Sequence, residues 1–295
     1  MVFLSADYRL RIAIPGRGRL RDGVEKLLSV AGIDLPPPGD RTLVSEDERT
    51  RYQLQSVRAR DIIGLVKSGS ADIGITGRDI VMEYGNGAVS ELMELDFGKC
   101  SLCIAVPEGS TVTDPSQLPD GVRVATMFPN ITGKFFEQIG RRVQIVPVSG
   151  TTEAAPMIGI ADAISDIVET GTTLRSNGLR SLCVVAKSTA VVVTGESTLE
   201  RRREEIDEFL CLVRSVQDAR SKRYLMVNVP SGSEIEVRRL LRGMEGPTFM
   251  RISGRDDFFV LHAVVEAGEL NALIPGLKAL GCTGILVSRI ERLVA

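Results

Sequence analysis

Residues 159–174 read GIADAISDIVETGTTL, and this stretch decides the fold. An Ala-Asp step leads into the apolar run 163–168, which predicts a buried strand. The run is followed by residues 170–173 (TGTT), where three hydroxyls surround a glycine that lets a ligand approach the backbone closely. A buried strand, such a turn and a following helix indicate an α/β fold with an anion-binding loop at the strand end.

The polar groups of this loop suit a phosphorylated sugar. The hydroxyls and backbone N–H groups after Thr170 can surround a phosphate dianion, and Asp166 can accept hydrogen bonds from two ribose hydroxyls. A phosphate and a sugar diol close together describe a phosphoribosyl group. We therefore expect the 5′-phosphate of a phosphoribosyl donor to bind between Asp166 and Thr173. The alternative is an ordinary strand, turn and helix with a threonine-rich cap.

A second stretch echoes the first. Residues 69–77 (GSADIGITG) repeat the G-x-A-D step, the apolar run and the Thr-Gly turn, about ninety residues earlier. The echo predicts two similar α/β lobes whose strand ends face a common cleft, although coincidence over so short a stretch is the alternative. We expect the chain to cross between lobes along 101–106 and to return along 190–194.

The remaining pattern predicts three domains. Strands at 9–15, 52–57 and 71–75 alternate with helices, and 197–218 is expected to form one long helix. After it, the order β-α-β-β-α-β predicts a ferredoxin-like (ACT-like) regulatory domain. The expected division is lobe I at 1–106 plus 191–220, lobe II at 107–190 and the regulatory domain at 224–295.

Composition excludes several classes of protein. A net charge of −2 gives no field that would attract nucleic acid, and no apolar run reaches the roughly 20 residues that span a bilayer. The N-terminus lacks the pattern of a signal peptide, and five cysteines are an odd number, so we expect a cytoplasmic protein with reduced thiols. Cys100 and Cys103 form a C-x-x-C, which we assign to core packing rather than to a redox or zinc site because partner ligands are absent. The single histidine, His262, is expected to be a strand residue and not a catalyst.

The longer string from Glu153 through Asp162 and Asp166 to Leu174 resembles the signature of the ATP phosphoribosyltransferase family, which performs the first step of histidine biosynthesis. Residues 16–20 (GRGRL) resemble its basic glycine loop, and 57–62 and 72–77 are similar to two further segments. Residues 124–129 depart from the family pattern, because Phe128 stands where relatives usually have tyrosine. The tail 224–295 resembles the long form of the family.

The resemblance implies a reaction in which N1 of ATP displaces pyrophosphate from phosphoribosyl pyrophosphate. Adenine N1 is unprotonated at neutral pH, so no strong base is required, and Mg²⁺ would stabilise the departing pyrophosphate. We expect catalytic roles for Asp166, Arg17, Arg19 and Arg58. The resemblance implies that phosphoribosyl or phosphate binding involves Glu153, Asp162, Glu169, Thr170, Gly171, Thr172 and Thr173. Nucleotide binding is assigned to Gly77 and Asp79, with Asp79 as an N-cap of helix 80–84 the favoured alternative.

The resemblance also implies feedback inhibition by histidine, with Thr248, Gly281 and Thr283 in the effector region, and assembly from dimer to hexamer. Two alternatives remain. One is an enzyme resembling prephenate dehydratase, whose Thr-Arg-Phe step is absent here, and the other is a two-lobed binding protein similar to periplasmic ones.

Overall fold

The computed structural model describes residues 9–35, 44–46, 51–241 and 246–294. The chain divides into two compact units, Met1–Lys26 with Ile33–Ile206, and Leu27–Gly32 with Asp207–Ala295. The first unit contains a six-stranded and a five-stranded sheet, and the second contains a four-stranded sheet.

The six-stranded sheet has the order β2-β3-β1-β4-β11-β5. Its strands are β1 (Leu10–Pro15), β2 (Val44–Glu46), β3 (Tyr52–Val57), β4 (Ile73–Gly77), β5 (Ser90–Glu94) and β11 (Ala190–Thr194). Strands β1, β3 and β4 are parallel. Their carboxyl ends therefore lie at one edge of the sheet, where open α/β sheets bind ligands.

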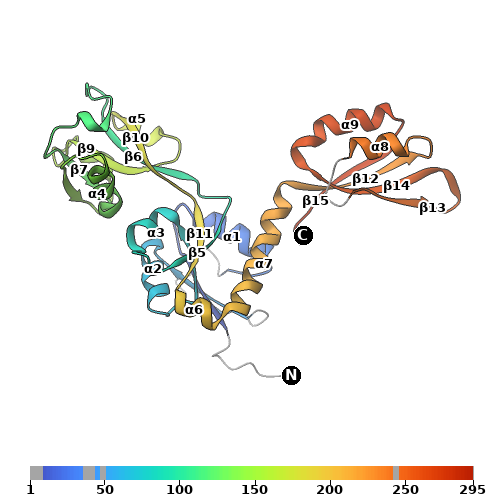
Figure 1. The fold of residues 1–295 in the computed structure, drawn as a ribbon, viewed down its shortest axis with the longest axis horizontal. Coiled ribbons are helices and arrows are strands. Elements are labelled where there is room, and N and C mark those ends of the chain that lie inside the picture. Colours follow the sequence, from blue (N-terminus) through green and yellow to red (C-terminus); the bar gives the residue numbers. More distant parts are fainter. Residues whose placement is uncertain (1–8, 36–43, 47–50, 242–245, 295) are drawn as a thin grey trace. The chain divides into compact units, whose positions relative to one another are not determined.

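Helices α1 (Arg21–Val30), α2 (Ala59–Lys67) and α3 (Arg78–Tyr84) connect these strands. Every residue of β4 and β11 is buried, which explains why both segments are apolar without alternation. On one face, Ile62, Ile63 and Val66 of α2 pack with Val191 and Val193 of β11. Figure 1 shows α2 and α3 beside this sheet.

The five-stranded sheet has the order β10-β6-β9-β7-β8. Its strands are β6 (Cys100–Pro107), β7 (Arg123–Thr126), β8 (Gln144–Pro147), β9 (Ala163–Val168) and β10 (Leu179–Ser188), with helices α4 (Pro129–Gln138) and α5 (Thr172–Ser176). Strands β7, β8 and β9 are parallel, so the segments that follow β8 and β9 share one edge. Phe136 of α4 and the apolar side chains of β6, β7 and β9 form the core beneath.

The two copies of the repeated G-x-A-D segment make the same contacts in the two lobes. Arg11 on β1 donates to both carboxylate oxygens of Asp72, at 3.0 and 2.9 Å, and to the carbonyl of Gly69 at 2.7 Å. Arg123 on β7 makes the same contacts to Asp162, at 3.1 and 2.8 Å, and to the carbonyl of Gly159 at 2.8 Å. Each sheet therefore carries one copy of the same clamp, as expected for two similar lobes.

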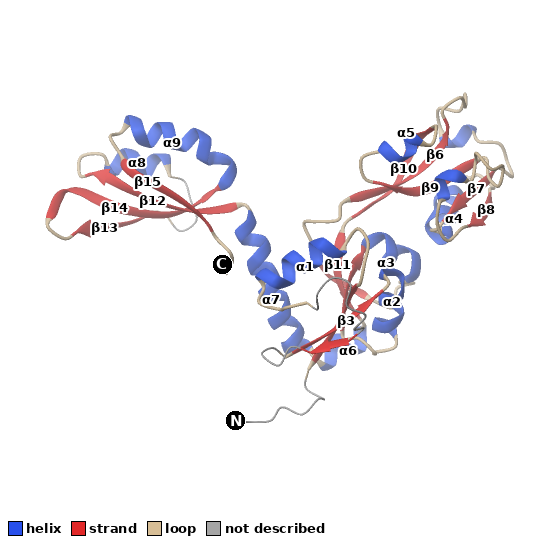
Figure 2. Cartoon of the chain, turned by 180° about the vertical axis from the view of Figure 1, so that it is seen from behind, coloured by secondary structure: helices blue, strands red, loops and turns tan. Residues whose placement is uncertain are grey.

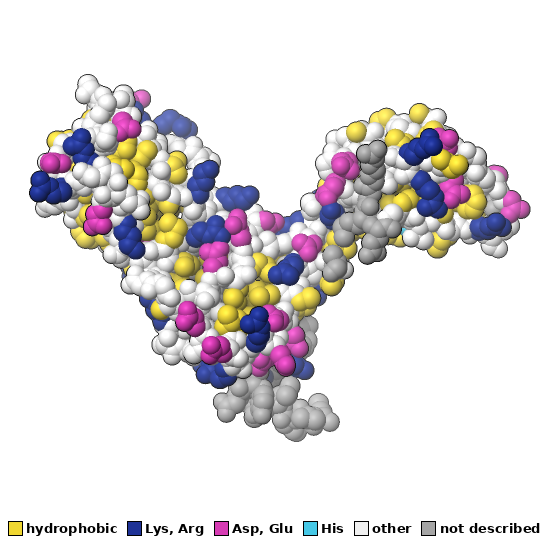
Figure 3. Space-filling view, viewed as in Figure 1, with side chains coloured by type: hydrophobic (Ala, Val, Ile, Leu, Met, Phe, Trp, Pro, Cys, Tyr) yellow, Lys and Arg dark blue, Asp and Glu magenta, His cyan; other side chains and the backbone are white. Residues whose placement is uncertain are grey.

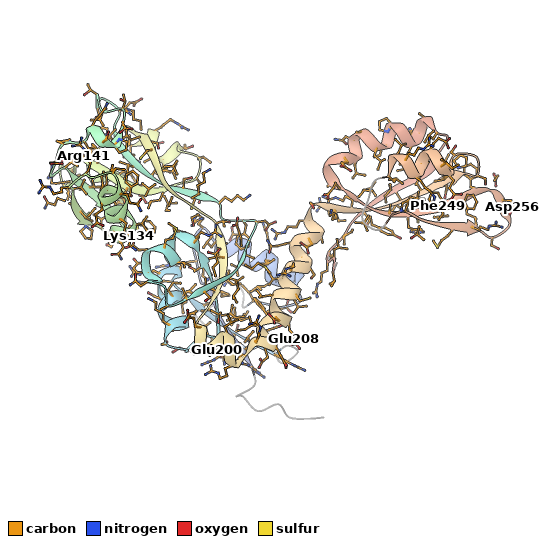
Figure 4. The ribbon with its side chains drawn as sticks, in the orientation of Figure 1. Lys134, Arg141, Glu200, Glu208, Phe249 and Asp256 are labelled. Carbon is orange, nitrogen blue, oxygen red and sulfur yellow. The ribbon has the colours of Figure 1, made fainter. Side chains whose placement is uncertain are left out.

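The expected single helix over 197–218 is wrong. The structure has α6 (Glu196–Arg201) and α7 (Arg203–Arg220), separated at Arg202, whose backbone leaves the helical region with φ −123° and ψ 32°. The Arg202 guanidinium donates to Asp72 at 2.9 Å and to the carbonyl of Arg9 at 3.0 Å. These contacts with distant residues lie at the break. The segment has no Gly or Pro from which the break could be predicted. Glu200 and Glu208 are exposed, as expected for the charges of this segment (Figure 4).

The second unit contains the C-terminal sheet, with the order β13-β14-β12-β15. Its elements are β12 (Lys222–Pro230), α8 (Glu234–Leu240), β13 (Thr248–Ile252), β14 (Arg255–Glu266), η4 (Ala267–Glu269), α9 (Leu270–Ala279) and β15 (Thr283–Arg289). All its pairings are antiparallel, and Val237, Leu273 and Leu277 of the helices pack on one face (Figure 2). The predicted fold class, two α/β lobes followed by a ferredoxin-like βαββαβ domain, is confirmed. The predicted domain boundaries stay a prediction.

Among the described residues, none of the helices combines the length and apolar character needed to cross a bilayer. On the face drawn in Figure 3, basic and acidic side chains are interspersed within each unit.

Candidate active site

A pocket of about 350 Å³ opens at the carboxyl end of β9. It is lined by Glu153, Asp166, Ile167, Val168, Glu169, Thr170, Gly171, Thr173 and Leu174. Glu153 comes from η3 (Thr152–Ala154), which follows β8, so two parallel strands deliver the lining residues to one edge of the sheet. The structure thus brings together most of the residues assigned to phosphoribosyl binding.

Asp166 is the carboxylate at the base of this pocket. Burial raises its pKa, and the nearby Glu153 carboxylate raises it further, while the N–H of Ile167, which donates to Asp166 Oδ1 at 2.7 Å, lowers it. The net pKa lies above the ordinary value of 3.8. Two acceptor side chains, Asp166 and Glu153, therefore face a pocket wide enough for a sugar.

Two residues beside Glu153 escaped the sequence analysis. Thr151 has φ 48° and ψ 42°, a left-handed conformation that is strained for a β-branched residue. The hydroxyl of Thr152 is buried, lacks a hydrogen bond of good geometry, and still lies close enough to Asp166 to lower the pKa of that carboxyl. Backbone strain and a buried unpaired hydroxyl at one place are typical of functional sites, and neither has a signal in the sequence.

The threonine-rich loop is built as the sequence predicts. Gly171 has φ 75° and precedes α5, and a Cβ built on it would lie 3.2 Å from Nη1 of Arg175. The hydroxyls of Thr170 and Thr172 lie 3.1 Å apart, so both point to the same region. Leu174, 6% exposed, packs with Ile164 and Leu179 and fixes the loop to the core.

Asp162 lies elsewhere. It precedes β9, at the opposite end of the strand from the pocket, and it is held by Arg123. Hydrogen bonds from the Arg123 side chain lower the pKa of Asp162 below its ordinary value. Asp162 is therefore outside the pocket lining and is bound to Arg123 at the other end of β9.

Arg17, Arg19 and Arg58 follow the carboxyl ends of β1 and β3, strands that pair at Pro15 and Val57. Arg17 and Arg58 are exposed. Arg19 is partly buried and lies 3.4 Å from Oδ1 of Asp79 and 3.6 Å from Oε1 of Glu169. Its Nη1 also donates to the carbonyl of Gly98. Arg19 thus links the glycine loop of the first sheet to the threonine-rich loop of the second.

Asp79 does not cap a helix, so the favoured interpretation is wrong. Helix α3 begins at Arg78, its N-cap is Gly77, and no side chain caps it. Asp79 is 4% exposed, and its Oδ1 accepts a hydrogen bond of 2.5 Å from the hydroxyl of Ser188. Sequence reasoning missed Ser188, because it lies 109 residues away on β10.

A second pocket of about 340 Å³ shares Val168 and Glu169 with the first. It is also lined by Arg78, Glu94, Lys99, Cys100, Ser101, Lys187, Ser188 and Thr189. Residues from both sheets contribute, as expected for a cleft between the lobes. Arg78 donates to Glu91 and, at 2.9 Å, to Glu94, and these carboxylates raise its pKa.

The C-x-x-C pair belongs to the core, as predicted. Cys100 is 8% and Cys103 is 4% exposed, both thiols are free, and burial raises the pKa of each. Cys100 is nevertheless a neighbour of Arg19, Asp79 and Ser188, whose charges and hydroxyl act on its pKa. His262 lies on β14, as expected for a strand residue, beside the Tyr224 hydroxyl.

The three residues assigned to the effector region lie in the second unit. Thr248 is on the edge strand β13 and Thr283 is on the opposite edge strand β15. Gly281, with φ 79°, forms the turn before β15. Within one copy of this sheet, Thr248 and Thr283 are therefore separated by the two central strands, β14 and β12.

Comparison with known proteins agrees with this geometry. The family model "ATP phosphoribosyltransferase" matches residues 58–215, and the model "HisG, C-terminal domain" matches residues 219–292. The chain is 39% identical to an ATP phosphoribosyltransferase from Methanocaldococcus jannaschii, over 97% of this chain and 100% of that one. It is 42% identical to one from Gemmatimonas aurantiaca, over 97% of this chain and 99% of that one.

Among solved structures, the chain is similar to one in the "ATP phosphoribosyl transferase (HisG:HisZ) complex from Thermotoga maritima". The TM-score is 0.62 and the identity is 29%, over 71% of this chain and 98% of that one. The predicted resemblance is confirmed by the two family models and by relatives that match along nearly the whole chain. The chain belongs to the ATP phosphoribosyltransferase family and is a pentosyltransferase.

Proposed function

We propose that the chain transfers the phosphoribosyl group of phosphoribosyl pyrophosphate to N1 of ATP and releases pyrophosphate in the first step of histidine biosynthesis. The observation that carries the proposal is the pocket after β9, where Glu153 and Asp166 adjoin the loop Glu169–Thr173. Two carboxylates suit the ribose diol, and the hydroxyls and N–H groups of the loop suit the 5′-phosphate.

The nucleotide is assigned to the neighbouring pocket. Its lining carries both Glu94 and Glu169 and three cations, of which Lys99 and Lys187 suit a polyphosphate. It meets the first pocket at Val168 and Glu169. Gly77 ends β4, and Asp79 follows it in α3 and contacts this region through Ser188. Such an arrangement would hold the two substrates next to each other across the cleft.

Catalysis would come from orientation and charge rather than from a base. Adenine N1 attacks C1 of the ribose, the C1–oxygen bond to pyrophosphate breaks, and N1 carries no proton that must be removed. Arg17, Arg19 and Arg58 lie at the edge that follows β1 and β3, and we assign them to the pyrophosphate and its developing charge. The half-buried Asp166 would hold the ribose hydroxyls while C1 moves between the two groups.

Magnesium fits this site as a substrate-bound ion. In the described part of the chain, no group of three or more His, Cys, Asp or Glu side chains is placed to hold a metal. Mg²⁺ commonly uses one or two carboxylates together with substrate phosphates, and Asp166 and Glu153 offer two carboxylates in the pocket. Bound there with phosphoribosyl pyrophosphate, it would neutralise the leaving group.

For the C-terminal domain we propose feedback inhibition by histidine, with Thr248, Gly281 and Thr283 in the effector region. We also propose a cytoplasmic homo-oligomer, from dimer to hexamer. Thr248 and Thr283 lie on opposite edge strands, so a histidine that contacted both would need residues from two copies of the domain. Inhibition requires histidine to bind one global state better than another.

The proposal is tested by mixing the full chain with ATP, phosphoribosyl pyrophosphate and Mg²⁺ and measuring pyrophosphate release. Release that requires both substrates, and that yields phosphoribosyl-ATP by mass spectrometry, supports the transfer. Release with phosphoribosyl pyrophosphate alone would indicate a hydrolase and overturn it. Titrating histidine into the same assay tests inhibition, and Thr248→Ala should weaken inhibition while leaving uninhibited turnover intact.

A further inference from the structure

Ser188, the last residue of β10, is buried against Asp79 and has a role that the reaction leaves unassigned. Its hydroxyl donates to Oδ1 of Asp79 at 2.5 Å and accepts from the backbone N–H of Asp79 at 2.9 Å. Ser188 is 6% exposed and Asp79 is 4% exposed. Asp79 lies in α3, directly after β4 of the first sheet, and Ser188 ends β10 of the second sheet, so this reciprocal pair joins the first lobe to the strand that returns from the second.

Polar contacts continue from Asp79 to the phosphoribosyl pocket, first as a long hydrogen bond and then as an ion pair. Oδ1 of Asp79 lies 3.4 Å from Nη2 of Arg19, and Nε of Arg19 lies 3.6 Å from Glu169, which lines that pocket. Arg19 is held on a further side by the carbonyl of Gly98. The direction of the Arg19 guanidinium therefore depends on where the Asp79 carboxylate points.

The backbone next to this pair leaves space for the Asp79 carboxylate. A Cβ at Gly77 would lie 2.1 Å from Oδ1 of Asp79, so the absence of a side chain at Gly77 makes room for it. Thr189, the residue after Ser188, donates its hydroxyl to the carbonyls of Leu95 at 2.7 Å and Phe97 at 2.9 Å. These hydrogen bonds join the segment that returns from the second lobe, at Thr189, to the segment that leaves the first lobe, at Leu95 and Phe97. The backbone beside Ser188 is therefore held in place.

We propose that Ser188 is a positioning residue for phosphoribosyl transfer. It fixes the Asp79 carboxylate, and through Asp79 the guanidinium of Arg19, at the meeting point of the two pockets. The inference rests on the proposed function and adds a residue that acts through Asp79 of the nucleotide site and through Arg19, the cation assigned to the pyrophosphate. A buried carboxylate that loses a hydroxyl donor must find another partner or move, and Arg19 is the cation beside it.

The test is a double-mutant cycle on the full chain, with Ser188→Ala, Asp79→Asn and the double variant. Ser188→Ala should lower kcat/KM for ATP by about tenfold, as expected for one lost hydrogen bond to a charged group. In the Asp79→Asn background the same change should alter kcat/KM by less than about twofold, because non-additivity shows that two residues act as one unit. Because Arg19 is assigned to the pyrophosphate, Ser188→Ala should also weaken the protection against thermal unfolding that phosphoribosyl pyrophosphate gives the chain.

Thr194→Val is the matched control. Thr194 is fully buried on β11, the strand that continues from this connection, and its hydroxyl donates to the carbonyl of Asp72 at 2.7 Å. It should lower the unfolding temperature without changing kcat/KM for ATP. Ser188→Cys, which keeps a weak donor of similar size, should give an intermediate kcat/KM and provides a second reading if the alanine variant folds poorly.

Three results would count against the inference. Ser188 variants that fold and keep kcat/KM within twofold of the parent chain overturn it. An equal loss in both backgrounds shows that Ser188 acts without Asp79, for example by touching the nucleotide directly, and also overturns it. A parent chain that releases no pyrophosphate with both substrates overturns the proposed function and this inference together, so the two failures are distinguishable.

Discussion

The carboxylate of Asp72 is fully buried between two arginines, Arg11 and Arg202, each of which donates to it at 2.9 Å. The repeated clamp in the second lobe, Arg123 with Asp162, has side chains that are 39% and 49% exposed. One motif is thus used twice, once around a fully buried carboxylate and once around an exposed one. The difference in solvent exposure decides what each copy contributes to stability.

Asp72→Asn should destabilise the chain far more than Asp162→Asn. Removing the charge of Asp72 leaves Arg11 and Arg202 without their common partner, and breaking a buried ion pair costs about 3–5 kcal/mol. The exposed pair at Asp162 is screened by water, so its loss should be small. Urea unfolding followed by circular dichroism measures both, and equal losses would contradict this account.

The contribution of Asp72 to the free energy of unfolding should also depend on pH. Burial raises the pKa of Asp72, but the hydrogen bonds and charge of Arg11 outweigh burial, so the net pKa lies below 3.8. A lowered native pKa stabilises the fold above the unfolded pKa, and this part is lost as the pH falls through the native value. The free-energy difference between Asp72→Asn and the parent chain should therefore shrink as the pH is lowered from 7 to below 3.8.

Asp166→Asn should abolish most turnover and leave the fold at least as stable. Burial raises the pKa of Asp166, so ionising this carboxyl costs the native state free energy that an amide does not. The sign is opposite to that at Asp72, because a raised carboxyl pKa destabilises the native state as the pH rises above 3.8. At pH 7 the variant should unfold at the same or a higher temperature in differential scanning calorimetry, and that gain should vanish near pH 3. A lower unfolding temperature with normal turnover would make Asp166 structural.

Gly171→Ala should impair binding of phosphoribosyl pyrophosphate. Gly171 has φ 75°, where a non-glycine residue costs about 1–2 kcal/mol, and its Cβ would lie 3.2 Å from Arg175. Gly178→Ala is a matched control, because Gly178 has φ 64°, nothing lies within 4 Å of its Cβ, and it is outside the pocket. Both should lose similar stability, but only Gly171→Ala should raise the KM for phosphoribosyl pyrophosphate in initial-rate measurements.

Glu83→Gln should loosen the contact between the lobes. The carboxylate of Glu83 in α3, fully buried, accepts the N–H groups of Asn130 at 2.9 Å and Ile131 at 3.0 Å, at the start of α4. Hydrogen bonds to a charged group contribute about 1.5–3 kcal/mol, and an amide offers only one acceptor atom. Amide hydrogen exchange should rise at these two N–H groups, whereas exchange in the C-terminal sheet should stay constant; unchanged exchange at α4 would contradict the expected role.

Local patterns predicted most of the elements and one half of the site. The strand 52–57 has the expected bounds, and the loop after Asp166 forms the expected pocket, because a buried strand and a glycine turn are encoded by neighbouring residues. What failed depends on partners far along the chain. Asp79 bonds to Ser188 instead of capping α3, and the helix expected over 197–218 breaks where Arg202 meets Asp72.

The path of the chain through the first sheet has a consequence for its synthesis. Strand β4 pairs with β11, and β11 begins at Ala190, after the entire second sheet has been made. A nascent chain emerging from the ribosome would therefore expose one side of the apolar strand β4 until about 110 further residues had left the exit tunnel, a delay of several seconds at ordinary elongation rates. The last strand of the second sheet, β10, ends at Ser188, only just before β11 begins. Both sheets are therefore completed by almost the same stretch of chain, and the edge of β4 stays unpaired until then.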